Sequence, residues 1–354
     1  MQKLFRPLLL GAAFASFLAS CSKDDNTTPT AAGTGQYAFV INEGNFTNGT
    51  GSVSRINKSN LKDNVDAFGS ANGGAVLGSV VESMTVVDTK GYVVVNNSNK
   101  IEVVSLPDFK STATISGLNQ PRFLTRSVAN PSRAYVTEWL GGPYPAPYTA
   151  GRISLIDLSS NKVTGTVPVG INPERMALVG GNLYVANSGS NFLTVISDAS
   201  GTATGTIALP ASASNVVVDK NNTLWVLCSS DYVSQPAKLL HFGTGATPTV
   251  QQTFTLPNAA VGGGGLRISP DGQQLYYSYN GAEYRMGIAD TNLPTTPLIR
   301  RDFYGFDIDP ATGILYGTDA LNYSTSGFML RYQPNGTKID SVNVQVSPNG
   351  VVFY

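Results

Sequence analysis

The chain has 354 residues, of which 23 are basic and 23 acidic, so its formal net charge is zero. This balance argues against a nucleic-acid partner, because binding to a phosphate backbone needs an excess of basic side chains. The sequence contains one histidine, His241, and two cysteines, Cys21 and Cys228, which excludes a zinc site built from several Cys and His ligands.

The first 35 residues have the pattern of an export signal followed by an anchor. A positively charged start precedes an apolar run over residues 8–18, which is too short to span a bilayer. The run leads into Leu-Ala-Ser-Cys at 18–21, which resembles the lipobox at which bacterial lipoproteins are cleaved and lipidated on cysteine. We therefore predict a signal peptide over 1–20, lipidation of Cys21 and a flexible tether over 21–35. An ordinary secretion signal is the alternative.

The four residues after Cys21 indicate to which membrane surface the lipoprotein is sorted. Residues 22–25, Ser-Lys-Asp-Asp, resemble the tag that directs some lipoproteins to the outer face of the outer membrane. No later apolar run in the sequence is long enough to cross a bilayer. We therefore expect the protein in the outer membrane, held by its lipid and facing the cell surface.

From residue 36 onward the chain repeats one unit. Each unit reads as four short strands separated by Gly, Asn, Asp and Ser turns, as in 173–179, 182–187, 192–197 and 203–209. An aromatic residue opens the second strand of each unit, at Phe39, Tyr92, Tyr135, Tyr184, Trp225, Tyr276 and Tyr316. These positions are about 40 to 53 residues apart, which is the period of a propeller blade. The sequence therefore predicts an all-β fold, a seven-bladed β-propeller of four-stranded blades over 36–354.

The two ends of this region complement each other. The first unit begins at its second strand, residues 37–42, with no inner strand before it. The chain ends in Val-Ser-Pro-Asn-Gly-Val-Val-Phe-Tyr at 346–354, which resembles the missing inner strand. We predict that the N- and C-terminal strands share the first blade, because this closes the ring and removes open sheet edges. Six or eight blades are the alternatives.

Loops that join the second strand to the third, and those that lead into the inner strands, open on one face of a propeller. We expect a rim of amides, aromatics and a few charges there, suited to a large, mostly neutral, polar ligand. The candidate ligand-binding residues are Asn42, Glu43, Phe46, Asn97, Arg122, Glu138, Trp139, Tyr144, Tyr148, Arg175, Asn187, Tyr232, Tyr279, Tyr284, Asp319 and Tyr323. Glu174 and Asn349 stand at the start of inner strands on the same face. For Asn and Asp at strand ends, the alternative is a turn residue that bonds its own backbone.

Trp139 opens the longest of these loops, Trp-Leu-Gly-Gly-Pro-Tyr-Pro-Ala-Pro-Tyr at 139–148. Three prolines stiffen the loop, and an insertion that displays Trp and Tyr indicates binding. Local packing of the loop on itself is the alternative. Cys228 and His241 both lie in apolar strands, where we expect an inert buried thiol and a structural imidazole.

No catalytic motif is recognisable, so we predict that the protein is not an enzyme and uses no cofactor or metal. One alternative is a calcium-dependent hydrolase or lactonase, with Glu43, Glu138, Asn187 and Asp319 as oxygen ligands. Another is a surface scaffold that grips a protein partner through Trp139 and its loop.

The stretches at 37–57, 92–105 and 119–124 resemble the YncE-like propeller lipoproteins of bacterial outer membranes. Asn-Glu-Gly-Asn at 42–45 and Asn-Asn-Ser-Asn-Lys-Ile-Glu-Val at 96–103 are similar to the BtuG group of cobalamin-binding lipoproteins. The resemblance implies a non-enzymatic surface protein that captures a bulky nutrient, a corrinoid such as vitamin B12 being the best guess. It also implies a TonB-dependent outer-membrane transporter as the partner that receives the nutrient.

Overall fold

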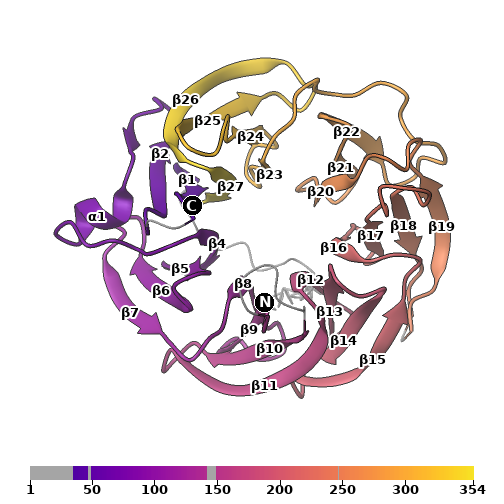
Figure 1. Ribbon diagram of the computed structural model, residues 1–354, viewed down its shortest axis with the longest axis horizontal. Coiled ribbons are helices and arrows are strands. Elements are labelled where there is room, and N and C mark those ends of the chain that lie inside the picture. Colours follow the sequence, from indigo (N-terminus) through magenta and orange to yellow (C-terminus); the bar gives the residue numbers. More distant parts are fainter. Residues whose placement is uncertain (1–34, 47–48, 142–148, 246) are drawn as a thin grey trace, which may run out of the picture.

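The computed structural model describes residues 35–46, 49–141, 149–245 and 247–354. The predicted signal peptide, Cys21 and all but the last residue of the tether lie outside the described residues. Seven β-sheets stand around a common centre (Figure 1). The prediction of an all-β, seven-bladed propeller is confirmed. None of the helices in the described part of the chain has the length and apolar character needed to span a membrane.

The first four blades follow one another in chain order. Blade 1 contains β27 (Pro348–Phe353), β1 (Tyr37–Asn42), β2 (Ser52–Asn57) and β3 (Asp63–Asn64). Blade 2 contains β4 (Val81–Val87), β5 (Lys90–Val95), β6 (Lys100–Ser105) and β7 (Ser111–Ile115). Blade 3 contains β8 (Pro121–Arg126), β9 (Arg133–Glu138), β10 (Ala150–Asp157) and β11 (Lys162–Ile171). Blade 4 contains β12 (Pro173–Val179), β13 (Asn182–Asn187), β14 (Phe192–Ser197) and β15 (Thr202–Ala208).

The last three blades complete the ring. Blade 5 contains β16 (Ala213–Val218), β17 (Leu224–Cys228), β18 (Lys238–Phe242) and β19 (Val250–Thr255). Blade 6 contains β20 (Gly263–Ile268), β21 (Gln274–Tyr279) and β22 (Ala282–Gly287). Blade 7 contains β23 (Gly305–Ile308), β24 (Leu315–Asp319), β25 (Ser326–Tyr332) and β26 (Lys338–Val346). The inner strands β27, β4, β8, β12, β16, β20 and β23 surround the centre of the ring (Figure 1), where their residues line a central channel.

Blade 6 departs from the four-stranded pattern. Its described residues form three strands, and an isolated bridge between Glu283 and Ile299 lies where the outer strand was expected. Pro294 and Pro297 fall in this segment. Proline cannot donate a ladder hydrogen bond, which explains why no continuous fourth strand forms there.

The ring closes as predicted, because the first and last strands pair. β1 lies between β2 and β27, and Val40 pairs with Val351 in the antiparallel register. The backbones of Tyr37 and Tyr354 exchange two hydrogen bonds, of 2.7 and 3.0 Å. β1 is therefore paired on both sides, and β27 takes the place at the channel that the inner strands hold in the other blades.

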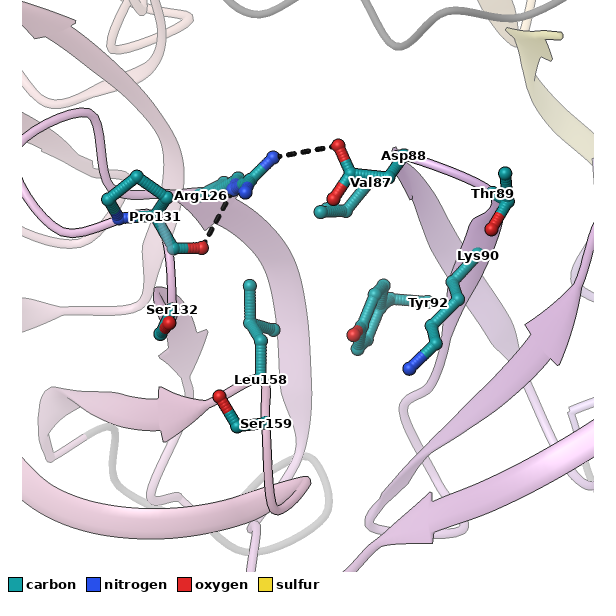
Figure 2. A pocket seen from close by; sticks show the side chains of 10 residues that line it. All are labelled: Val87, Asp88, Thr89, Lys90, Tyr92, Arg126, Pro131, Ser132, Leu158 and Ser159. Atoms are coloured by element: carbon teal, nitrogen blue, oxygen red, sulfur yellow. Dashed lines mark hydrogen bonds and ion pairs between the residues drawn. The ribbon is translucent and has the colours of Figure 1, made fainter.

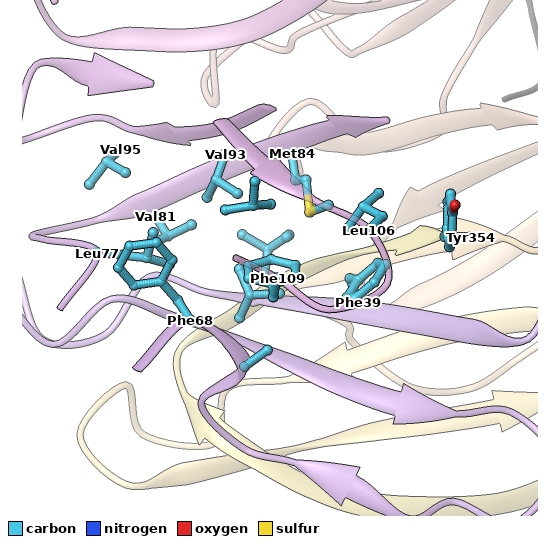
Figure 3. Packing of buried hydrophobic residues seen from close by; sticks show 14 residues of the cluster. Phe39, Phe68, Leu77, Val81, Met84, Val93, Val95, Leu106, Phe109 and Tyr354 are labelled. Carbon is cyan, nitrogen blue, oxygen red and sulfur yellow. The ribbon is translucent and has the colours of Figure 1, made fainter. Parts of the chain in front are cut away.

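The core lies between neighbouring blades. One cluster combines Phe39 of β1 with Val81, Val93 and Phe109 of blade 2 (Figure 3). The helix α1 (Ala67–Ala71) links these two blades and adds Phe68 to the cluster. All seven aligned aromatics are almost completely buried, so they are packing residues rather than ligand contacts.

Candidate functional site

At the mouth of the channel, the first residues of the inner strands pair irregularly with the neighbouring strands. The strand-end residues Asn42, Val95, Glu138, Asn187, Cys228 and Tyr279 pair with the first residues of the adjoining inner strands, which places these strand ends and the loops beyond them on one face. Directly after these pairs the register shifts, and inner-strand residues are left without a partner. The skipped residues are Asn349, Glu82, Arg122–Phe123, Glu174–Arg175, Ser214 and Gly264–Gly265. A bulge of this kind turns side chains away from the ladder, here towards the channel.

Four of these inner strands share a further feature. Val80, Gln120, Asn172 and Ser347, the residues just before β4, β8, β12 and β27, have positive φ angles between 45° and 57°. Such a conformation is costly for a residue with a side chain, and backbone outliers cluster at functional sites. The same strained conformation precedes Glu82, Arg122, Glu174 and Asn349, which lie on adjacent blades. We infer that the strain is tolerated at these positions because it presents polar side chains to the channel.

Arg122 is the centre of the charged part of the mouth. Its guanidinium pairs with Glu82 of blade 2 and, at 3.2 Å, with Glu174 of blade 4. Burial raises the pKa of both carboxyl groups against the opposing charge of Arg122, and that of Glu174 rises to about 7. A carboxyl group that titrates near neutrality can exchange a proton at physiological pH. The three side chains are therefore a candidate acid–base group.

Trp139 covers this group from above the channel. Its ring lies 4.4 Å from the guanidinium carbon of Arg122, and its indole N–H donates to the Pro173 carbonyl at 3.2 Å. The hydrogen bond fixes the ring, and the stack combines an apolar face with a cation. The side chain is half-buried, so part of it faces solvent.

A second polar group lies where blade 7 meets blade 1. Glu43 accepts hydrogen bonds from Tyr304 Oη at 2.9 Å and from Asn349 Nδ2 at 2.9 Å. Tyr304 is 43% exposed and packs edge-on against Tyr323, which is 55% exposed. Burial, followed by the charge of Glu82, raises the pKa of Glu43. On this side of the mouth, exposed aromatic rings therefore lie beside polar groups that hydrogen bonds hold in place.

Below the mouth the channel holds a cavity of about 210 Å³ that is lined by residues of every inner strand. Its charged lining residues are Glu82, Arg175, Arg267 and Asp307. Arg267 Nε donates to Asp307 at 2.8 Å, and the guanidinium of Arg175 lies 4.5 Å from the Phe123 ring.

A second hollow, of about 290 Å³, lies between blades 2 and 3 on the face opposite the mouth, and Figure 2 shows the residues that line it. Its arginine, Arg126, donates to the Pro131 carbonyl at 2.8 Å and pairs with Asp88 at 3.1 Å. The carboxylate of Asp88 is 72% exposed. Arg126 is therefore engaged and Asp88 is solvated, and Lys90 also lines the hollow. We centre the candidate site on the mouth, where charged groups from several blades meet.

The structure brings some of the predicted residues together at the mouth and places others elsewhere. Glu43, Arg122, Trp139, Arg175 and Tyr323 lie at the mouth or in the channel. Phe46 and Tyr232 are exposed, at 67% and 64%, and Asn97 is half-buried in the β5–β6 turn. Tyr144 and Tyr148 lie outside the described residues.

The remaining predicted residues are engaged within their own blades. Asn42, Glu138 and Asn187 are fully buried and bond to residues of blades 1, 3 and 4. Tyr279 binds the Asn258 backbone, Tyr284 stacks on Tyr277, and Asp319 pairs with Arg301. We leave these six side chains out of the site that we propose.

Sequence reasoning missed Glu82, Arg267, Asp307 and Tyr304. Glu82 could have been found from its position, since it follows the start of an inner strand just as Arg122 and Glu174 do. Its strand begins with Val81 where the others begin with Pro121 and Pro173, which hides the match.

The four residues weighed as calcium ligands do not converge. Glu138 is bound to Arg152, and Asn187 to the backbone of its own blade. The described ranges contain no group of three or more His, Cys, Asp or Glu side chains placed to hold a metal ion. Cys228 is fully buried, and burial raises the pKa of its thiol to about 12, which makes it unreactive.

The sequence matches DUF5074, described as a domain of unknown function, over residues 36–347. The chain belongs to this family. The match covers the propeller up to the residue before β27. No curated protein matches the sequence.

Solved structures with the same architecture have varied activities. The periplasmic gluconolactonase of Pseudomonas aeruginosa is similar to this DUF5074 propeller with a TM-score of 0.65 and 13% identity, over 90% of this chain and 98% of that one. A quinoprotein alcohol dehydrogenase-like protein of Bacteroides thetaiotaomicron gives a TM-score of 0.65 and 15% identity, over 90% and 78%. The dihydro-heme d1 dehydrogenase NirN gives 0.53 and 13%, over 72% and 54%. These identities show a shared fold and not a shared reaction.

The prediction that the protein is not an enzyme is wrong, because propellers similar to this DUF5074 chain include a gluconolactonase and a dehydrogenase. The prediction relied on the lack of a local catalytic motif. A propeller assembles its site from separate inner strands, so such a motif is not needed. Glu82 and Glu174 are 40 and 52 residues from Arg122 in the chain, yet both bind its guanidinium.

Proposed function

We propose that this propeller is a lipid-anchored protein of the outer membrane that captures a bulky polar nutrient at the channel mouth and presents it to a TonB-dependent transporter. The observation that carries the proposal is the mouth itself, where polar side chains from adjacent blades lie beneath the half-buried or exposed rings of Trp139, Tyr304 and Tyr323. Anchoring through Cys21 and the surface location rest on the sequence pattern.

A corrinoid is the first ligand to test, because of the resemblance to the YncE-like lipoproteins and their BtuG group. The channel cavity of about 210 Å³ is smaller than the roughly 300–1,000 Å³ of pockets that enclose drug-sized ligands. A corrinoid would therefore lie across the mouth, in contact with the aromatic rim. Rings held by hydrogen bonds, as Trp139 and Tyr304 are, lose little freedom when a ligand binds.

The test is calorimetric titration of cyanocobalamin into the chain from residue 26 onward. We expect a Kd in the micromolar range or tighter, raised about tenfold by Trp139→Ala, which corresponds to about 1.4 kcal/mol. Ile339→Ala is the matched control, since Ile339 is an exposed apolar residue on β26, an outer strand. Absence of heat at high concentration would show that the corrinoid assignment is wrong.

The transporter is tested separately, by pulling down partners of the anchored protein from outer membranes. Recovery of a TonB-dependent transporter supports presentation. Recovery of a different protein through a contact that Trp139→Ala abolishes, without cyanocobalamin binding, favours the scaffold alternative.

A hydrolase of lactones is the second candidate, and the pKa of Glu174 favours it. A carboxyl group with a pKa of about 7 suits general acid–base catalysis, and Arg122 can stabilise a developing oxyanion. Glucono-δ-lactone hydrolysis above the spontaneous rate, lowered about 100-fold or more by Glu174→Gln, would support it. Glu283→Gln is the control, because Glu283 also has a pKa of about 7 through burial but lies on β22, the third strand of blade 6. Equal rates in wild type and Glu174→Gln would refute it.

A further inference from the structure

The cavity below the mouth contains one arginine that makes no hydrogen bond or ion pair with the described residues. Of its four charged lining residues, Glu82 pairs with Arg122 and Arg267 pairs with Asp307. Asp307 also accepts a hydrogen bond from the backbone N–H of Val351 at 2.8 Å. Arg175 is the fourth.

The direct contact of Arg175 is a stack on Phe123, and the charges of Asp307, Glu174 and Glu82 act on it without an ion pair. Its guanidinium carbon is 4.5 Å from the Phe123 ring centroid, and no described residue accepts a hydrogen bond from it or forms an ion pair with it. Burial, and next the charge of Arg267, lower the pKa of Arg175 to about 10. Arg175 is half-buried, and a charge that is partly removed from water gains from an acceptor that bonds it directly. An arginine that lines a cavity and lacks a directly bonded acceptor is suited to a ligand that carries an acidic group.

We infer that the channel cavity binds the carboxylate group of a small polar molecule, with Arg175 as the direct partner of the carboxylate. The planar guanidinium matches a carboxylate in two parallel hydrogen bonds. A carboxylate brings a single negative charge to this guanidinium. A phosphate dianion would bring its second charge close to Glu82 and Asp307, which line the same cavity.

The rest of the cavity wall is suited to hydroxyl groups. The hydroxyls of Ser83 and Thr85 donate to backbone carbonyls of β8, so their lone pairs remain as acceptors. Thr125 and the amide of Asn349 also line the cavity. A small hydroxy acid or sugar acid combines a carboxylate with such groups, and its size fits a cavity of about 210 Å³.

This inference does not rest on the proposed function. A corrinoid is too large for the cavity and would lie on the rim, whereas the carboxylate site lies inside the channel. Binding of cyanocobalamin and binding of a small acid are measured separately, so either can fail without the other.

The test is calorimetric titration of the chain from residue 26 onward with gluconate, glucuronate and lactate, and with glucose and inorganic phosphate for comparison. We expect at least one of the three acids to bind at millimolar concentration or below, glucose to give no heat, and phosphate to bind at least tenfold more weakly than that acid. Arg175→Met should weaken acid binding about 30-fold or more. Arg285→Met is the matched control, since Arg285 is exposed on β22 and donates to the Pro334 carbonyl, and it should bind as the wild type does.

A thermal melt without ligand separates binding from folding. Because Arg175 makes no hydrogen bond or ion pair with the described residues, Arg175→Met should melt at the wild-type temperature or above it. A clear fall in Tm would show that Arg175 stabilises the empty fold and would overturn the inference. It is also overturned if none of the acids binds, if Arg175→Met binds them unchanged, or if phosphate or glucose binds more tightly than they do.

Discussion

Burial of Glu174 beside Glu82 makes the stability of the propeller depend on pH. Its pKa is raised to about 7 in the folded state, from 4.5 in a solvated chain. Between these values the unfolded chain loses the proton that the folded protein keeps, so the free energy of unfolding falls as the pH rises. One pH unit corresponds to about 1.4 kcal/mol, so the total loss is about 3 kcal/mol at most.

Glu174→Gln removes this contribution, since an amide does not titrate. We expect urea unfolding to show a smaller loss of stability between pH 5 and pH 8 in Glu174→Gln than in the wild type. Glu283→Gln should flatten the pH dependence similarly, because burial raises the pKa of Glu283 to about 7 as well. The same slope in wild type and Glu174→Gln would contradict the assignment.

At this scale the sequence predicted where polar side chains gather better than which of them meet there. Arg122 and Arg175 were found because they follow the start of inner strands, and the mouth is where they lie. Asn42, Glu138 and Asn187 have the same polar character at the ends of second strands, but the pleat turns them into their blades. Which way a strand-end side chain points depends on the bulge opposite it, and a bulge leaves no mark in one sequence.

Each blade is one sheet of the ring, and blade 1 is assembled from both ends of the chain. Without β27, strand β1 would present an unpaired edge to the channel, and Ala38 and Val40 would lose Val351 from their cluster. We expect a chain that stops at residue 347 to lose cooperative thermal unfolding. A synthetic peptide of residues 348–354 should restore it in trans.

A peptide carrying Val351→Asp is the control for this experiment, because the aspartate would place a charge in the apolar cluster at a position that is 4% exposed. It should not restore folding. If the truncated chain melts at the temperature of the full chain, closure by β27 is not needed for stability.

The elements themselves were largely predictable. The period of the aligned aromatics gave the blade count, because each blade must bury the same inner position against its neighbour. The outer strand of blade 6 was not predicted correctly, because the pattern of one blade was extended to a segment with Pro294 and Pro297.

For the molecule as a whole, the length of the proposed tether limits how far the propeller can move between capturing a ligand and delivering it. Residues 21–35 reach at most about 50 Å when fully extended. Deleting residues 26–34 should leave ligand binding by the purified protein unchanged and reduce nutrient uptake by cells several-fold. Replacing the same residues by a Gly/Ser segment of equal length is the control and should preserve uptake. Unchanged uptake after the deletion would show that the length of this segment is irrelevant to delivery.

The direction of β1 shows at which face of the ring the tether is attached. β1 runs from Tyr37 to Asn42, and Asn42 is the residue that pairs with Pro348 at the mouth. The chain therefore joins the ring at the end of β1 that is farthest from the mouth. We propose that a lipid on Cys21 brings the back of the propeller nearer to the membrane and lets its mouth face the surrounding medium. Because the tether is flexible, the propeller can then turn and bring its mouth to a transporter in the same membrane.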